Sequence, residues 1–185
     1  MESILRKSIM DHMDVSHLLG DVQFGFVGRN FTVLQLLHMS GEWCETRNRG
    51  GTIDVCYMDF TKAFDTVPHC RLLSKIKSYG IQGNLHSWVQ DFLSEHCQKV
   101  MINGSASERV NVLSGVPQGS VLEPVLFVLC INDLPDTVRS RIMLYADDTK
   151  IYKEIRNPDY TVAIQDDIHR MEEWSRLWLL IFLPR

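Results

Sequence analysis

Apolar residues recur along the chain with two different spacings, which predict two kinds of secondary structure. Where they return every three to four residues, an amphipathic helix is expected. This pattern predicts helices over about residues 1–19, 32–46, 84–96 and 121–132, and a last helix that opens at Pro158. In the second of these helices, Leu34, Leu37 and Trp43 form one stripe, which we expect to face the core.

The clearest strand covers residues 53–60 and ends at Asp59. It is apolar on both faces, which is typical of a strand in the centre of a sheet. A helix is predicted to follow, with Pro68 in its first turn and Asp65 or Thr66 as its N-cap.

Two further pairs of short β-prone runs predict hairpins. Residues 99–102 and 109–113 flank an Asn-Gly turn signal, and the runs before and after Asp147-Asp148 place these two aspartates at a second turn. Because the hairpins alternate with helices, the expected fold class is α+β, with an antiparallel sheet packed on helices.

Composition adds a constraint on partners and compartment. The chain has 185 residues, is 45% hydrophobic and carries a formal net charge of −4, so it lacks the surplus of cations that helps proteins bind nucleic acid. Its five cysteines are odd in number and widely spaced, which predicts reduced, mostly buried thiols in an intracellular protein. The longest apolar run, at 177–183, is too short to span a bilayer, so no membrane partner is expected.

Three aspartates stand where predicted strands end: Asp59 after the first strand, and Asp147 and Asp148 in the last hairpin. Taken alone, an Asp-Asp pair is a common turn sequence. A third carboxylate at a neighbouring strand end favours a divalent cation, because Mg²⁺ prefers oxygen ligands. Two such ions, about 3.5–4 Å apart, can drive in-line phosphoryl transfer.

Three segments resemble, in order and spacing, successive motifs of the reverse transcriptases of non-LTR (LINE-like) retrotransposons. They read DFTKAFDTVPH at 59–69, GVPQGSVL at 115–122 and YADDTK at 145–150, and QFGF at 23–26 is similar to a fingers motif of that family. The resemblance runs from about residue 4 to residue 178. It implies a polymerase palm at 53–178, a partial fingers region at 1–52 and a truncated tail at 179–185.

The resemblance implies a catalytic metal centre. Asp59, Asp147 and Asp148 match the family's catalytic, metal-binding aspartates, and the backbone carbonyl of Phe60 matches a further metal ligand. The implied cofactor is Mg²⁺, as two ions, with Mn²⁺ as a possible substitute.

The resemblance also implies a nucleotide site. Phe64 matches the ring under the incoming sugar, which clashes with a 2′-hydroxyl, and Gln118, Gly119 and Arg29 match positions that contact nucleotide or template. The implied partners are an RNA template, a DNA primer and deoxynucleoside triphosphates. For the parent element, the implied localisation is cytoplasmic and nuclear.

The chain also departs from the family pattern. Glu123 stands where the family has glycine, and its carboxylate would repel phosphates, although with Ser120 it forms the Ser-x-x-Glu pattern of a capping box. The usual Gly-Arg-Ser-Thr reads GRNFT at 28–32, and the lysine-bearing stretch after the last helix reads WLLIFLPR at 178–185. The first fingers motif, thumb and endonuclease have no counterpart, so we expect the apolar run 177–182 to lack a packing partner and to favour association.

Three functions remain open from the sequence. The first is the core of an RNA-directed DNA polymerase, which the intact aspartates favour. The alternative is a catalytically inactive palm remnant that acts at most as a binding or interaction module, which Glu123 and the negative charge favour. The third is a palm-fold nucleotidyl cyclase. Gln118 and Gly119 argue against it, because a template-free enzyme does not need them.

Overall fold

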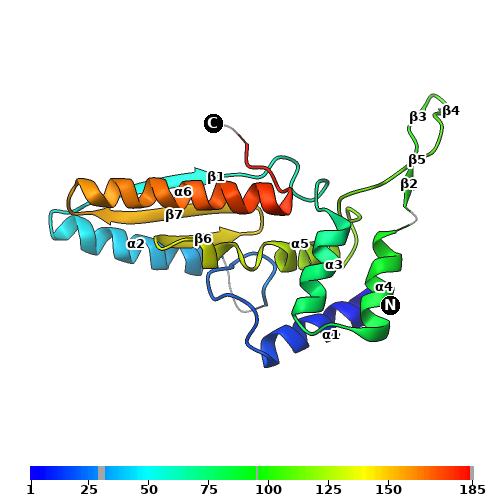
Figure 1. The fold of residues 1–185 in the computed structure, drawn as a ribbon, viewed down its shortest axis with the longest axis horizontal. Coiled ribbons are helices and arrows are strands. Elements are labelled where there is room, and N and C mark those ends of the chain that lie inside the picture. The colour runs from blue at the N-terminus through cyan, green and yellow to red at the C-terminus, as the bar shows by residue number, and fades with distance from the viewer. Residues whose placement is uncertain (29–31, 95, 184–185) are drawn as a thin grey trace.

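The computed structural model describes residues 1–28, 32–94 and 96–183 (Figure 1). Within these ranges, no helix is both long and apolar enough to cross a membrane. In chain order the elements are α1 (Glu2–Val15), α2 (Thr32–Asn48), β1 (Thr52–Met58), α3 (His69–Ser78), α4 (Gly83–Leu93), β2 (Cys97–Gln98), β3 (Met101–Ile102), β4 (Ser105–Ala106), β5 (Val110–Asn111), α5 (Glu123–Ile131), the 3₁₀ helix η1 (Leu134–Thr137), β6 (Arg141–Tyr145), β7 (Asp148–Ile155) and α6 (Pro158–Trp178). The expected α+β class with an antiparallel sheet is confirmed.

The main sheet has the order β1-β7-β6, and both pairs are antiparallel. The expectation that the first strand is central is therefore wrong: β7 is central, and β1 pairs along its length with β7 alone among the named strands. Both faces of β1 are apolar because helices cover both sides of the sheet. Ile53 and Val55 pack in the cluster that includes α2 residues, whereas Cys56 and Met58 pack in the cluster that includes α6 residues.

Helix α2 buries only part of its predicted apolar stripe: Trp43 packs against the cluster of Met39, Met143 and Tyr152, but the rest of the stripe faces outward. The side chains of Leu34 and Leu37 are 47% and 63% exposed, whereas Gln35 and Met39 are buried. The Gln35 amide accounts for this orientation, because its Nε2 donates to the carbonyl of Leu144 at 3.3 Å. A polar contact with the sheet thus sets which side of α2 is buried.

Helices α3, α4 and α5 form the other half of the core. Residues 125–131 of α5 are all buried, and α5 packs against α3. The predicted cap of α3 is wrong: its N-cap is Pro68, with no side-chain hydrogen bond. The Thr66 hydroxyl instead donates to the carbonyls of Thr61 and Lys62, 3.2 Å away in both cases, so it stabilises the turn before the helix.

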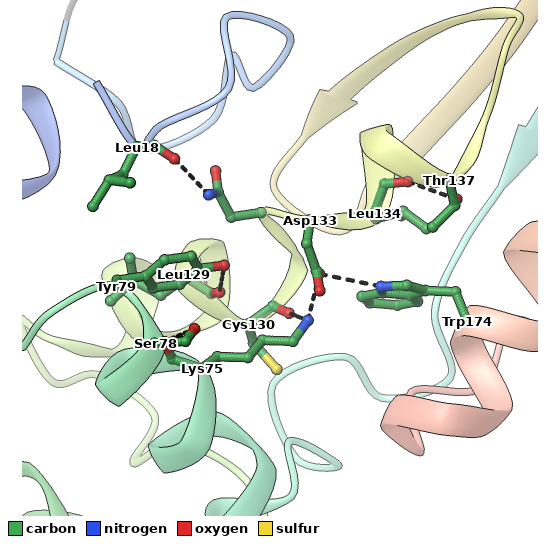
Figure 2. A network of polar contacts seen from close by, with 11 residues as sticks. Leu18, Lys75, Ser78, Tyr79, Leu129, Cys130, Asp133, Leu134, Thr137 and Trp174 are labelled. Atoms are coloured by element: carbon green, nitrogen blue, oxygen red, sulfur yellow. Dashed lines mark hydrogen bonds and ion pairs between the residues drawn. The ribbon is translucent and has the colours of Figure 1, made fainter. Parts of the chain in front are cut away.

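A buried lysine joins the two halves (Figure 2). Lys75 of α3 is only 3% exposed, and its Nζ donates to the carbonyl of Cys130 and to Asp133 Oδ1. The ammonium also lies 3.7 Å from the ring centroid of Trp178 and 4.6 Å from that of Trp174, whose indole N–H donates to Asp133 at 3.1 Å. Burial lowers the pKa of Lys75, and the bond to Asp133 opposes this effect. The network fixes α3 and α5 to α6, which packs on the sheet.

The predicted hairpin around Asn103-Gly104 is confirmed. It forms an arm in which β2 pairs with β5 and β3 pairs with β4. Asn103 and Gly104 have φ values of +49° and +83°, as a two-residue hairpin turn with positive φ at both positions requires. Figure 1 shows the arm projecting from the body of the protein.

Two expectations about burial fail. Cys130 is buried, but Cys44, Cys70 and Cys97 are exposed, because they lie on outward faces of helices and on the projecting arm. The apolar run after α6 also has a packing partner: Leu180 is fully buried in the main core, and Phe182 packs against it.

Candidate active site

The β6–β7 hairpin carries two of the three aspartates to one end of the sheet. Tyr145 and Asp148 are its last pair, so the turn consists of Ala146 and Asp147, and Asp148 begins β7. The prediction of a hairpin is confirmed, but its turn lies one residue earlier than expected. Strand β1 ends with the pair Met58↔Thr149. Continuing this register by one residue puts Asp59 opposite Asp148.

Charge repulsion links the three carboxylates. The pKa of Asp147 is raised, first by partial burial and then by the negative charges of Asp148 and Asp59. Three mutually repelling carboxylates gain most from a divalent cation, which satisfies their oxygens and removes the repulsion. The donor set therefore fits Mg²⁺. In the described parts of the chain, no three His, Cys, Asp or Glu side chains already stand in a ready-made metal-ligand geometry.

Residues near the N-terminus hold the β6–β7 turn in place. Gln23 Oε1 accepts hydrogen bonds from the backbone N–H groups of Gly25 at 2.8 Å and Ala146 at 3.2 Å. The backbone at Gln23 also forms a parallel bridge with Leu144 of β6. A Cβ atom at Gly25 would lie 2.3 Å from the Ala146 nitrogen, so any side chain there would displace the turn. Sequence reasoning missed this supporting role, although the glycine of the QFGF motif was its signal.

The segment after α6 runs antiparallel to the chain at Asp59. Leu183 N–H donates to the Asp59 carbonyl and Thr61 N–H donates to the Ile181 carbonyl, each at 2.8 Å. Between them, the rings of Phe60 and Phe182 stack with centroids 4.3 Å apart. Backbone groups alternate between the two edges of an extended segment, so the Phe60 carbonyl faces away from this tail. It is thereby left available to act as the predicted ligand.

Phe64 lies at the border between the core and the surface. It is half-buried, with its ring centroid 4.6 Å from that of the fully buried Phe127 and 6.5 Å from that of Phe26. One edge of the ring is anchored in the core and the other remains accessible. This position suits a residue that contacts a ligand without moving.

The loop that carries Gln118 docks directly on the segment that carries Phe64. Val116 N–H donates to the Phe64 carbonyl at 2.8 Å, and Gln118 Nε2 donates to Asp65 Oδ1 at 2.7 Å. Gly115 has a φ of +91°, and a Cβ there would lie 2.7 Å from the Asp65 carbonyl oxygen. Two motifs about 50 residues apart in sequence thus form one surface, where Asp65 holds Gln118 rather than capping a helix.

Glu123 closes the same loop. Its Oε2 accepts a hydrogen bond from the Gly119 N–H at 2.6 Å, and its own N–H donates to Ser120 Oγ at 3.0 Å. The Ser120 hydrogen bond of the predicted capping box is therefore formed, but α5 begins at Glu123 with Leu122 as its N-cap, so Ser120 does not cap the helix. The glutamate half reaches Gly119 instead of Ser120, whose N–H donates to the carbonyl of Pro117. A carboxylate thus holds a backbone donor that the family resemblance assigns to the nucleotide site. Arg29 lies outside the described residues.

An antiparallel sheet with carboxylates at one end and helices packed on its faces is the arrangement that the motif resemblance led us to expect. Residues 1–184 match the family described as reverse transcriptase (RNA-dependent DNA polymerase). The chain belongs to this family, and the prediction drawn from its motifs is confirmed.

Curated relatives come from mobile elements. The chain is 29% identical over 183 residues to the probable RNA-directed DNA polymerase from transposon X-element of Drosophila melanogaster, and 28% identical over 187 residues to that of the mobile element jockey from the same fly. Each match covers 96% of this chain and 20% of the relative. The chain therefore spans about a fifth of the length of these relatives.

Solved structures support the fold. Apo telomerase from Candida tropicalis, truncated from its C-terminal domain, matches with a TM-score of 0.65 over 97% of this chain and 38% of that one. Telomerase from Candida albicans, in complex with a TWJ fragment of telomeric RNA, matches with a TM-score of 0.68 over 98% of this chain and 34% of that one. At 11% identity in both cases, the likeness concerns the fold alone.

Proposed function

We propose that this chain is the catalytic core of an RNA-directed DNA polymerase, which transfers deoxynucleotides to a primer 3′-hydroxyl with two divalent ions. The observation that carries the proposal is the register of the sheet: β1 pairs with β7 and β7 with β6, so that Asp59, Asp147 and Asp148 come to the same end of the sheet. When bound, Mg²⁺ would supply charge neutralisation for the phosphates and activation of the attacking hydroxyl.

The residues of the chain have separate proposed roles in metal binding and in the choice of sugar. Asp59, Asp147 and Asp148 hold the ions, with the Phe60 carbonyl as a further ligand. Phe64, anchored on Phe127, excludes a 2′-hydroxyl by its position.

Two residues of the 115–122 loop are proposed to contact the template and the nucleotide. Gln118, fixed by Asp65, and Gly119 line the pocket where template and nucleotide meet. The relatives named as RNA-directed DNA polymerases support RNA as the template.

One observation favours a second candidate, an inactive palm remnant. Glu123 Oε2 accepts a hydrogen bond from the Gly119 N–H, which places a negative charge beside the proposed nucleotide pocket. Phosphates entering there would be repelled. On this reading the aspartates still bind metal, but no chain is extended.

Primer extension on an RNA template, in Mg²⁺ or Mn²⁺, separates the two candidates. Extension by the chain and its loss in Asp147→Ala/Asp148→Ala would support the polymerase. Mn²⁺ binding by calorimetry without extension would favour the remnant. Absence of both would overturn the metal site itself. In a variant that does extend, Phe64→Val should raise ribonucleotide incorporation without abolishing DNA synthesis.

A further inference from the structure

A pocket of about 490 Å³ opens at the end of the sheet opposite the aspartates. It lies between the second half of α2, the loop before β6, the end of β7 and the start of α6. Ile53 at the beginning of β1 and Lys153 near the end of β7 both line it. At about 3.3 Å per residue, Lys153 lies roughly 17 Å along β7 from Asp148. The pocket is therefore separate from the candidate active site.

Basic side chains dominate this pocket, although the chain as a whole carries a net charge of −4. The lining includes three glutamates and five basic residues, which are Arg49, Arg139, Arg141, Lys153 and Arg156. Basic groups from three separate segments of the chain converge here. Such a concentration of positive charge in an acidic protein favours an anionic ligand.

The glutamates cancel only part of this charge. Each is already paired with one lining arginine: Glu42 with Arg141 at 2.6 Å, Glu154 with Arg156 at 2.8 Å and Glu45 with Arg49 at 3.6 Å. Arg139 and Lys153 have no carboxylate partner among residues 1–28, 32–94 and 96–183. Two cations thus remain available to a ligand.

The position of Arg139 is built into the fold. Asp167 of α6 is fully buried, and its two oxygens accept the backbone N–H groups of Arg139 at 3.0 Å and Ser140 at 2.8 Å. Arg170 forms an ion pair with the same carboxylate. The backbone that presents Arg139 to the pocket is consequently held by charge-assisted bonds, which lowers the entropy cost of binding through that side chain.

The pocket wall also offers an aromatic surface. Lys153 Nζ lies 5.4 Å from the ring centroid of Tyr160, which also lines the pocket. A ligand with a flat group would find a stacking surface here.

We infer that this pocket binds the phosphate backbone of a single nucleic-acid strand, outside the active site. Phosphate oxygens fit the two available cations, and a base can stack beside Tyr160. The volume suits a nucleotide unit better than one small anion. The inference does not depend on polymerase activity, since none of these residues belongs to the aspartate centre.

The test measures the binding of a fluorescein-labelled single-stranded RNA of about 12 nucleotides by fluorescence anisotropy. The buffer contains EDTA to exclude metal-dependent binding. Arg139→Ala/Lys153→Ala should weaken binding at least about tenfold, because two phosphate contacts are lost. It should also reduce the slope of log K against log salt by about 1.4. Arg139→Lys/Lys153→Arg, which keeps both charges, should retain binding.

The matched control is Arg6→Ala/Lys7→Ala on the exposed side of α1, which removes the same charge far from the pocket. An equal loss in both double alanine variants would show non-specific attraction and overturn the inference. Displacement of the RNA by an equal concentration of inorganic pyrophosphate would assign the pocket to free phosphates and also overturn it. Asp147→Ala/Asp148→Ala should bind the RNA normally even if the proposed polymerase activity is absent.

Discussion

The backbone N–H of Leu183 donates a hydrogen bond to the carbonyl of Asp59 at 2.8 Å. The last described residue of the chain thus contacts the first of the three catalytic candidates. Together with the stacked rings of Phe60 and Phe182, this bond makes the segment after α6 an additional short strand beside the site. The position of Asp59 therefore depends on residues more than a hundred positions later.

Phe182→Ala should destabilise the protein by roughly 1–3 kcal/mol, since a half-buried ring and its stack on Phe60 are lost. Ile181→Ala is the matched control, because that side chain lies on the exposed side of the same segment and should change stability by less than about 0.5 kcal/mol. Urea unfolding measures both. Equal effects of the two substitutions would show that the ring stack does not hold the tail.

Neutralising one aspartate should stabilise the metal-free protein. Burial and, after it, the nearby charges of Asp148 and Asp59 raise the pKa of Asp147. Asp148→Asn removes one of these charges, so we expect a small gain in stability in EDTA, because solvent screens charges that are largely exposed. We expect Mn²⁺ to raise the melting temperature of the unmodified chain, and Asp148→Asn should lose that increase. Asp54→Asn, at an exposed position of β1, is the control and should keep that increase. A Mn²⁺ response that survives in Asp148→Asn would contradict the assignment of Asp148 as a ligand.

Glu123→Gln should separate the charge of this residue from its hydrogen bond. The amide oxygen can still accept the Gly119 N–H, so the loop should stay in place with a loss of at most about 1 kcal/mol. Removal of the negative charge should strengthen deoxynucleoside triphosphate binding, measured by calorimetry with Ca²⁺. Glu108→Gln on the projecting arm is the control and should leave nucleotide affinity unchanged. If both variants behave alike, Glu123 does not obstruct the site.

Stability should fall at alkaline pH because of a buried thiol. Burial raises the pKa of Cys130 from 9.0 to about 12. Between these values the folded state keeps a proton that the unfolded state releases. The contribution of the thiol to the free energy of unfolding is therefore fully present below pH 9, and it declines by up to about 1.4 kcal/mol per pH unit above it. Tyr79, with a pKa raised to about 12, adds to the loss above pH 10, whereas the lowered pKa of Lys75 opposes it.

Cys130→Ala isolates the thiol contribution to this decline. The variant should be less stable at pH 7, because it leaves a small cavity, yet it should lose stability less steeply from pH 9 upward. Cys70→Ala removes an exposed thiol and should follow the unmodified protein. Urea midpoints across the pH series measure all three. A decline in Cys130→Ala as steep as in the unmodified chain would exclude the thiol as its cause.

Local patterns predicted the elements well because local chemistry determines them. The turn at Asn103-Gly104, the strand that ends before Asp59 and the hairpin that carries Asp147 all follow from short-range signals. The buried face of α2 could not be predicted in this way. It depends on Gln35 reaching the Leu144 carbonyl, a contact across 109 residues that helical periodicity does not contain.

The candidate site likewise combines features that the sequence predicted with features that depend on long-range contacts. Motif resemblance pointed to the three aspartates as candidates, and the register of β1 and β7 explains why Asp59 lies opposite Asp148. The supports were not predictable, because both are long-range contacts: the Gln23 side chain accepts from the Ala146 N–H, and the Leu183 N–H donates to the Asp59 carbonyl. An apolar tail looks unpartnered in a sequence, because the strand edge that receives it is defined only by the folded sheet.

The strand order β1-β7-β6 has a consequence for the nascent chain on the ribosome. Strand β1 is synthesised roughly 90 residues before β7, which corresponds to about 5–18 s at ordinary translation rates. During that interval its apolar residues and its backbone donors and acceptors have no sheet partner. Strand β1 therefore remains unpaired, and open to non-native contacts, until the β6–β7 hairpin has been synthesised. We expect translation slowed between β1 and β7 to lower the yield of folded protein.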